Sequence, residues 1–160
     1  LYKMSESPTH RLQWQLYLQF QDSRDYANKK DVLILGDLPF LVSRDSADVW
    51  SHQEYFKLDF SAGAPPDMLY SKGQRWGMPP YNWRNIEEHD YDYLKEKLRF
   101  AGNFYDMYRI DHVVGIFRVW TIHMSEPVET AGFNGSFDPK DESEWEEHGR
   151  KILSVMIKLR

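Results

Sequence analysis

The chain has 160 residues, 41% of them hydrophobic and 28% charged, which is the balance of an ordinary globular protein with one domain-sized core. The formal net charge of -5 argues against nucleic acid as a partner, because nucleic acid is normally bound by basic surfaces. The absence of cysteine excludes disulfides, thiolate nucleophiles and cysteine-ligated zinc, and it fits a cytoplasmic location. No apolar stretch approaches the roughly 20 residues of a membrane helix, so we expect no membrane partner.

The first half of the sequence predicts one helix and one strand. Residues 8–27 carry apolar side chains at helical spacing. Residues 31–36 form a short, continuous apolar run, which is typical of a strand buried on both faces. Residues 37–88 show no sustained period, apart from one helical turn at 47–52, and we expect a long loop there. Loops of that length are usually functional.

The second half predicts a helix at 89–103, a strand at 104–110, a second polar loop, and an amphipathic helix at 143–160. This alternation of helices and strands favours parallel strands, with the long loops after the strand ends. The predicted fold class is therefore α/β, a partial (β/α)8 TIM barrel that holds only the middle strands and helices. A whole barrel takes about 250 residues, so we expect residues 1–160 to be part of one longer barrel domain.

Two acidic residues, Asp37 and Asp111, come directly after the two predicted strands. Arg109 lies two residues before Asp111, so both side chains should point to the same side of the strand. A guanidinium there would keep Asp111 ionised, and an ionised carboxylate at a strand end can attack an anomeric carbon. The alternative interpretation is that Arg109 and Asp111 form a structural ion pair without catalytic function.

Aromatic residues make up 16% of the chain, and such rings can stack on the C–H faces of sugars. Five sequence blocks, taken together and in this order, resemble the 4-α-glucanotransferases of the amylomaltase or disproportionating-enzyme family, glycoside hydrolase family 77. The resemblance runs from about residue 8 to residue 160, and it is carried by residues 36–40, 45–50, 62–67, 73–83 and 109–112.

The resemblance implies a retaining transferase that needs no cofactor and no metal. It would move a segment of an α-1,4-glucan donor, through a covalent glycosyl-aspartate, to the 4-hydroxyl of a glucose or maltooligosaccharide acceptor. Asp111 is similar to the family's nucleophile, Arg109 to its partner on the strand, and Asp37 to an acidic residue of the donor subsite. His112 would contact the substrate.

Residues 61–88 resemble the family's loop over the active-site cleft. The resemblance implies that five residues of this loop line donor or acceptor subsites, and Trp76 and Tyr81 suit sugar stacking. These five are Pro66, Asp67, Trp76, Tyr81 and Asn82. Where many members of the family carry aromatic residues after the Pro-Pro-Asp of this loop, the present sequence has Met68 and Leu69.

Two further carboxylates of the family, an acid/base glutamate on the next strand and a later aspartate, have no counterpart in these residues. We therefore expect the 160 residues alone to be inactive, and unpaired strand edges to make them self-associate. One competing interpretation is a non-catalytic relative that only binds α-glucans. Another is a metal hydrolase, suggested by the acids and histidines at 45, 48, 52, 111 and 112, but no metal-binding histidine spacing supports it.

Overall fold

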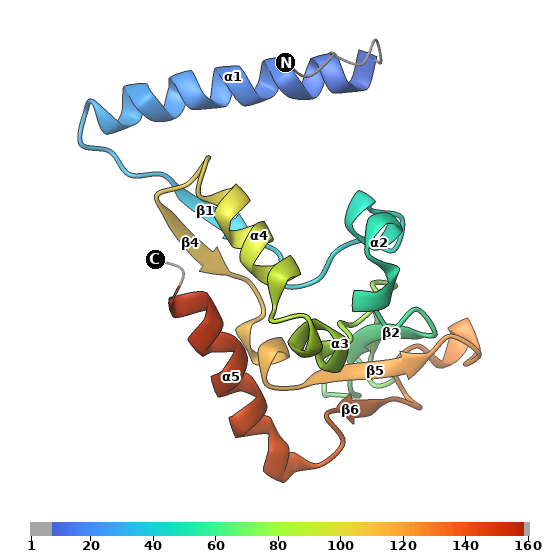
Figure 1. The fold of residues 1–160 in the computed structure, drawn as a ribbon. Helices are drawn as coiled ribbons and strands as arrows, with labels where there is room; N and C mark the ends of the chain where they lie inside the picture. The colour runs from blue at the N-terminus through green and yellow to red at the C-terminus, as the bar shows by residue number, and fades with distance from the viewer. Residues whose placement is uncertain (1–7, 159–160) are drawn as a thin grey trace. The chain divides into compact units, whose positions relative to one another are not determined.

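A computed structural model describes residues 8–158 of the chain. The chain divides into two compact units (Figure 1). The first unit combines the residues up to Leu38 with Lys97–Arg109, and the second combines Pro39–Glu96 with the residues from Ile110 onward. Among residues 8–158, no helix has both the length and the apolar character that crossing a membrane requires.

The first unit contains the helix α1 (Pro8–Asn28) and the paired strands β1 (Leu35–Leu38) and β4 (Met107–Ile110). The helix predicted at 8–27 is confirmed. The amides of Asp106 and Met107 donate to the carbonyl of Ile34, and further along the strands the side chains of Asp37 and Arg109 are bonded. The residue numbers thus rise together along the two strands, so β1 and β4 run parallel, as the alternation of elements predicted.

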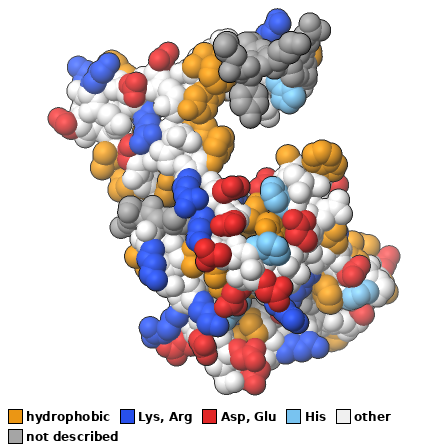
Figure 2. All heavy atoms as spheres, in the orientation of Figure 1, with side chains coloured by type: hydrophobic (Ala, Val, Ile, Leu, Met, Phe, Trp, Pro, Cys, Tyr) orange, Lys and Arg blue, Asp and Glu red, His pale blue; other side chains and the backbone are white. Residues whose placement is uncertain are grey.

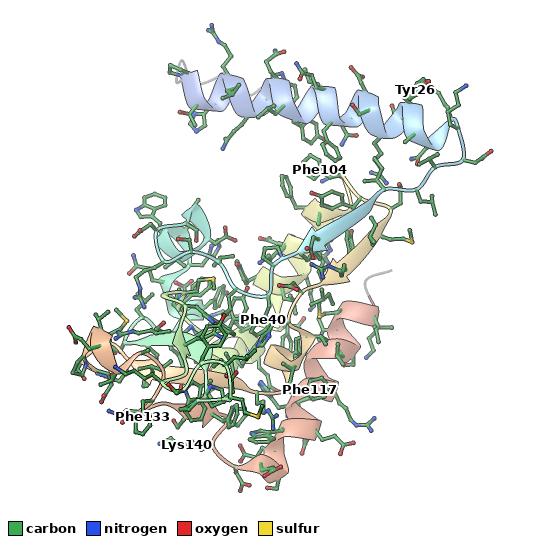
Figure 3. All side chains as sticks on the ribbon, turned by 180° about the vertical axis from the view of Figure 1, so that it is seen from behind. Tyr26, Phe40, Phe104, Phe117, Phe133 and Lys140 are labelled. Atoms are coloured by element: carbon green, nitrogen blue, oxygen red, sulfur yellow. The ribbon has the colours of Figure 1, made fainter. Side chains whose placement is uncertain are left out.

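Asp106 fastens α1 to the start of the two strands. Its carboxylate accepts hydrogen bonds from the backbone N–H of Ile34 (2.9 Å) and from Arg24 of α1 (2.9 and 3.2 Å). These hydrogen bonds hold the pKa of Asp106 below its usual range, and the bond from Ile34 has the largest effect. Phe104 completes the attachment, since its ring meets those of Tyr17 and Phe20 edge to face at 5.5 and 5.4 Å (Figure 3).

The expectation that the strand region at 31–36 is buried on both faces is wrong. Val32, Leu33 and Leu35 are 54%, 61% and 59% exposed. The reason is that, in the part of the chain that the structure describes, β1 belongs to a sheet of only two strands. Its apolar side chains therefore lack the neighbouring strands and covering helices that a central parallel strand has.

The second unit contains a four-stranded antiparallel sheet of order β3-β2-β5-β6. Its strands are β2 (Phe60–Ala64), β3 (Gln74–Arg75), β5 (Val119–His123) and β6 (Ser136–Asp138). The expectation of two long loops, within 37–88 and after Asp111, is therefore wrong, because the two segments pair with each other. Phe60 lies opposite His123, and Gly63 lies opposite Trp120.

The remaining helices lie close to the predicted positions, with one exception. The predicted turn at 47–52 is α2 (Ala47–Ser51), whose first turn is capped by the Ser46 hydroxyl. The helices predicted at 89–103 and 143–160 are α4 (Asp92–Ala101) and α5 (Trp145–Ile157). The helix α3 (Trp83–Glu88) was not predicted. Short 3-10 turns occur at Gln53–Tyr55, Val113–Ile116, Val128–Thr130 and Glu142–Glu144.

The core of the second unit is built from aromatic and branched aliphatic side chains, and Phe40 lies deep among them in Figure 3. The helix α5 joins the core through Ile152, which is 1% exposed, and through Gly149. A Cβ at Gly149 would overlap the ring of Phe117, so the absence of a side chain lets the helix approach. The buried core residues are Phe40, Leu41, Val49, Tyr55, Phe56, Ala62, Tyr81, Ile86, Tyr93, Ile116, Val119 and Ile152.

Candidate active site

Asp111 is the first residue after β4, and it lines a cavity of about 350 Å³ in the second unit. A volume of this size lies within the usual range for small-molecule sites. Five of the seven lining residues are apolar or aromatic, and the other two are Asp111 and its neighbour His112. The lining residues are Pro39, Phe40, Leu41, Trp76, Met78, Asp111 and His112.

The backbone turns sharply at His112, which has the left-handed conformation (φ 52°, ψ 48°) and precedes the 3-10 turn Val113–Ile116. A residue with a side chain rarely adopts this conformation, so the packing around it must hold it there. The imidazole meets the ring of Trp76 edge to face at 5.2 Å and that of Phe40 at 6.0 Å. These two rings therefore fix His112 against the cavity.

Trp76 reaches the cavity because the antiparallel sheet brings it there. It follows β3, and its backbone N–H donates to the carbonyl of Ala62 in β2 at 2.9 Å. Its indole Nε1 donates to the side chain of Gln74 at 3.0 Å, which sets the orientation of the ring. The ring is only half-buried, so one part of it remains open to a ligand.

Tyr81 lies behind the cavity and not in its wall. Its side chain is 5% exposed, and its ring meets that of Phe40 edge to face at 5.7 Å. Burial raises the pKa of its phenol, so the hydroxyl stays protonated. The stacking predicted for Tyr81 would need an open ring face, whereas in this structure the ring is buried and packs against Phe40.

Asp37 and Arg109 lie together in the first unit. Arg109 forms an ion pair with Asp37 through two nitrogens, with Nε to Oδ1 at 3.1 Å. The two side chains are 60% and 54% exposed, and exposed pairs of this kind contribute at most about 1 kcal/mol. The sequence pattern predicted Arg109 beside Asp111 and did not predict its pairing with Asp37, and Asp37 lies within β1 instead of after it.

Pro66, Asp67 and Asn82 do not line the cavity at Asp111. Pro66 and Asp67 lie at an exposed turn, where the Asp67 carboxylate accepts the N–H groups of Leu69 and Tyr70 at 2.8 and 2.6 Å. Asn82 precedes α3 and donates to the carbonyl of Glu54 at 3.2 Å.

Two lining residues, Phe40 and Met78, were not among the predicted site residues. The signal for Phe40 was its place three residues after Asp37, within the first of the recognised blocks. Met78 lies in the same sequence block as Trp76, residues 73–83.

Within residues 8–158, no three histidine, aspartate or glutamate side chains gather in an arrangement suited to a metal ion. Asp48 instead accepts a hydrogen bond from Tyr93 at 2.8 Å.

Fold and site together define an α/β protein with an aromatic-walled cavity and a carboxylate at a strand end, a combination suited to carbohydrates. The chain belongs to the 4-alpha-glucanotransferase family, whose sequence pattern matches residues 5–157. The resemblance inferred from the five blocks is thereby confirmed.

Individual relatives agree with this assignment. The chain is 41% identical to a 4-alpha-glucanotransferase of Chlamydia pneumoniae over 146 residues, which cover 91% of this chain and 26% of the relative. It is 34% identical to a 4-alpha-glucanotransferase of Clostridium butyricum over 128 residues, which cover 76% of this chain and 26% of that relative. The chain thus spans about a quarter of the length of these curated relatives.

The fold is similar to that of solved amylomaltases. The structure of amylomaltase from Streptococcus agalactiae in complex with acarbose matches with a TM-score of 0.76 and 34% identity, over 90% of this chain and 30% of that one. Amylomaltase from Corynebacterium glutamicum matches with a TM-score of 0.72 over 86% of this chain and 20% of that one. Because its sequence identity is 24%, this match supports the fold alone.

Proposed function

We propose that the whole protein containing these residues is a 4-α-glucanotransferase, which transfers a segment of an α-1,4-glucan to the 4-hydroxyl of glucose or a maltooligosaccharide. The observation that carries the proposal is the position of Asp111, directly after β4 in a cavity walled by Trp76 and Phe40, in a chain that belongs to this family. The S. agalactiae relative was solved with acarbose, which supports a sugar as the ligand of this cavity.

In the proposed mechanism, the Asp111 carboxylate attacks the anomeric carbon of the donor as the bond to the leaving glucan breaks. A proton must reach the leaving oxygen, and we assign its donor to the part of the relatives' sequence that this chain does not match. The acceptor's 4-hydroxyl then attacks the same carbon, gives its proton to that acid/base group and releases Asp111. Two inversions give net retention of configuration.

The surrounding residues take positioning and binding roles in this proposal. His112 donates or accepts a hydrogen bond with a sugar hydroxyl, and the open part of the Trp76 ring stacks on a sugar face. Tyr81 supports the cavity through Phe40. The pair of Arg109 and Asp37 would help to shape the donor subsite, and the turn at Pro66 and Asp67 would contact the glucan further out.

The barrel is also a proposal. The parallel pair β1 and β4, separated in sequence by α4, has the arrangement of two neighbouring barrel strands. The antiparallel sheet would then be an elaboration of the loops that follow these strands, with residues 61–88 over the cleft. We assign residues 1–160 to one such catalytic domain. The lack of cysteine supports a cytoplasmic location for it.

The test is a disproportionation assay on the whole protein. Incubation with maltotriose should give glucose and longer maltodextrins, and Asp111→Asn should lower the rate by a factor on the order of 10³ or more. Asp59→Asn, a change at an exposed aspartate outside the cavity, is the matched control and should leave the rate unchanged. Full activity of Asp111→Asn would refute the nucleophile assignment. Maltodextrin binding without transfer by the unmodified protein would favour a binding-only relative.

A further inference from the structure

The second unit contains another groove, of about 220 Å³, which shares no lining residue with the cavity at Asp111. The start of α3, the end of β6 and the first turns of α5 surround it. We call it the Trp83 groove, and its lining residues are Lys57, Asn82, Trp83, Arg84, Glu87, Asp138, Pro139 and His148.

The charged side chains of the Trp83 groove are balanced. Lys57 forms an ion pair with Asp138, Arg84 pairs with Glu88 at 3.1 Å, and Glu87 lies 3.4 Å from Lys151. Figure 2 shows acidic and basic side chains interspersed over this part of the molecule. Because each charge has a partner of opposite sign, neither an anion nor a cation is strongly favoured, and the groove suits a neutral polar ligand.

His148 and Asn82 offer hydrogen bonds to such a ligand. Burial lowers the pKa of His148, so the imidazole is neutral at pH 7 and carries one donor and one acceptor. Within residues 8–158, no hydrogen bond engages either of its nitrogens, and its ring only meets that of Trp83, edge to face at 5.8 Å. The side-chain nitrogen of Asn82 donates to the carbonyl of Glu54 at 3.2 Å, which fixes the side-chain amide and leaves its side-chain oxygen for a ligand.

Trp83 supplies an apolar wall beside these polar groups. Its ring is half-buried and is held at 4.9 Å from that of Tyr81. A flat ring next to fixed donors and acceptors is the arrangement that binds a sugar, whose C–H face is apolar and whose hydroxyls are polar. Tyr81 also meets Phe40 of the cavity at Asp111, so a single buried ring lies between the two sites.

We infer that the Trp83 groove is a second carbohydrate-binding site, which holds a glucosyl unit of an α-glucan away from the reacting bond. The choice of glucose over another neutral sugar rests on the proposed function. The benefit of such a site is multivalency, because a glucan held at one point stays at high local concentration near the other. Retention of polymeric glucans should therefore depend on the groove, whereas turnover of a short donor should not.

The test uses the whole protein with Asp111→Asn, so that the glucan is bound without being consumed. Native electrophoresis through gels that contain soluble starch measures the apparent dissociation constant from the retardation. Adding His148→Phe places an apolar ring in the groove and removes its free donor and acceptor. We expect starch to bind about fivefold more weakly, the equivalent of roughly one hydrogen bond.

Two further variants make the result interpretable. Glu87→Arg extends a long side chain at the mouth of the groove from an exposed position, where folding is not at risk, and it should weaken binding in the same way. His123→Phe is the matched control, since it makes the same substitution at an exposed histidine outside the groove, and it should bind like the parent.

The outcomes separate this inference from the proposed function. In the background with an intact Asp111, His148→Phe should convert maltotriose at the unmodified rate. If both groove variants bind starch as tightly as the control, the second site does not exist, whatever the activity of the protein. If the groove variants lose starch binding while the unmodified protein shows no transferase activity, the groove stands and the proposed function fails.

Discussion

Replacing Gly115 with alanine should deform the cavity at Asp111 from behind. A Cβ at this position would lie 2.7 Å from Cδ1 of Phe40 and 2.9 Å from Cδ2 of His112, with Cε1 of Phe40 closer still. Ordinary carbon contacts are about 3.5–4.0 Å, so the two rings must retreat by roughly 1 Å. Overpacking of this kind costs about 1–3 kcal/mol of the free energy of unfolding.

The same displacement should be visible in catalysis. Phe40 and His112 both line the cavity, and a shift of about 1 Å in a positioning group can lower the rate by roughly 10²-fold. We therefore expect Gly115→Ala to lower kcat/KM for maltotriose by about 10- to 100-fold. Urea unfolding followed by circular dichroism and disproportionation of maltotriose measure the two effects separately.

A second substitution tests the cause. Phe40→Leu shortens the side chain that the new methyl would meet, so the loss of stability caused by Gly115→Ala should be at least about 1 kcal/mol smaller in that background. Urea unfolding of the four proteins in this cycle gives the coupling. If Gly115→Ala is as stable and as active as the parent, or if the two changes are simply additive, the contact of Phe40 with Gly115 does not shape the cavity.

Two other substitutions test the packing and the electrostatics of α5. Ile152→Ala should lower the free energy of unfolding by about 2–5 kcal/mol, and Ile152→Val by only about 0.5–1.5, as measured by urea unfolding. Acidification from pH 7 to 5 should destabilise the protein, because burial lowers the pKa of folded His148 below the 6.5 of the unfolded chain. The unfolded state then binds the proton first, so stability present above pH 6.5 is lost as the pH falls through the folded pKa. An unchanged slope of stability against pH in His148→Gln would contradict this.

The helices could be predicted because their information is local. In α1, α4 and α5 the apolar residues recur at helical spacing, and each helix was found within a few residues of its ends. The parallel pair β1 and β4 followed from the alternation of elements. The exposure of β1 could not be predicted, because burial depends on which other strands and helices surround a strand. A run of apolar residues does not contain that information.

The antiparallel sheet could not be predicted, because its strands are specified by long-range pairing. The central strand β2 has the sequence Phe-Ser-Ala-Gly-Ala, which lacks both the β-branched residues and the alternation that mark a strand. Its partner β5 lies almost 60 residues further along the chain. Ser61 and Ala62 are fully buried in β2, which pairs with β3 on one side and β5 on the other.

The site shows the same division between local and long-range information. Asp111 and His112 could be placed at a strand end by local sequence, and the resemblance to a known family supplied the chemistry. The position of Trp76 depends on the bond of its backbone to Ala62, and the burial of Tyr81 depends on Phe40, so neither could be read from the local sequence. Only the family resemblance placed Trp76 at a subsite. Two residues of one block, five positions apart, thus differ in role: one ring faces the cavity and the other supports it.

This division has a consequence for how the cavity works. The segment that the sequence suggested as a long loop is held by β2, β3 and α3, and the backbone around Trp76 is bonded into that sheet. The wall that carries Trp76 is therefore pre-organised, and a sugar does not have to order it on binding. The turn that follows Pro66 is open to solvent, and Met68 and Leu69 there are 101% and 87% exposed. Under the proposed function, adaptation to different glucans should therefore come from that turn, while the wall beside Asp111 stays fixed.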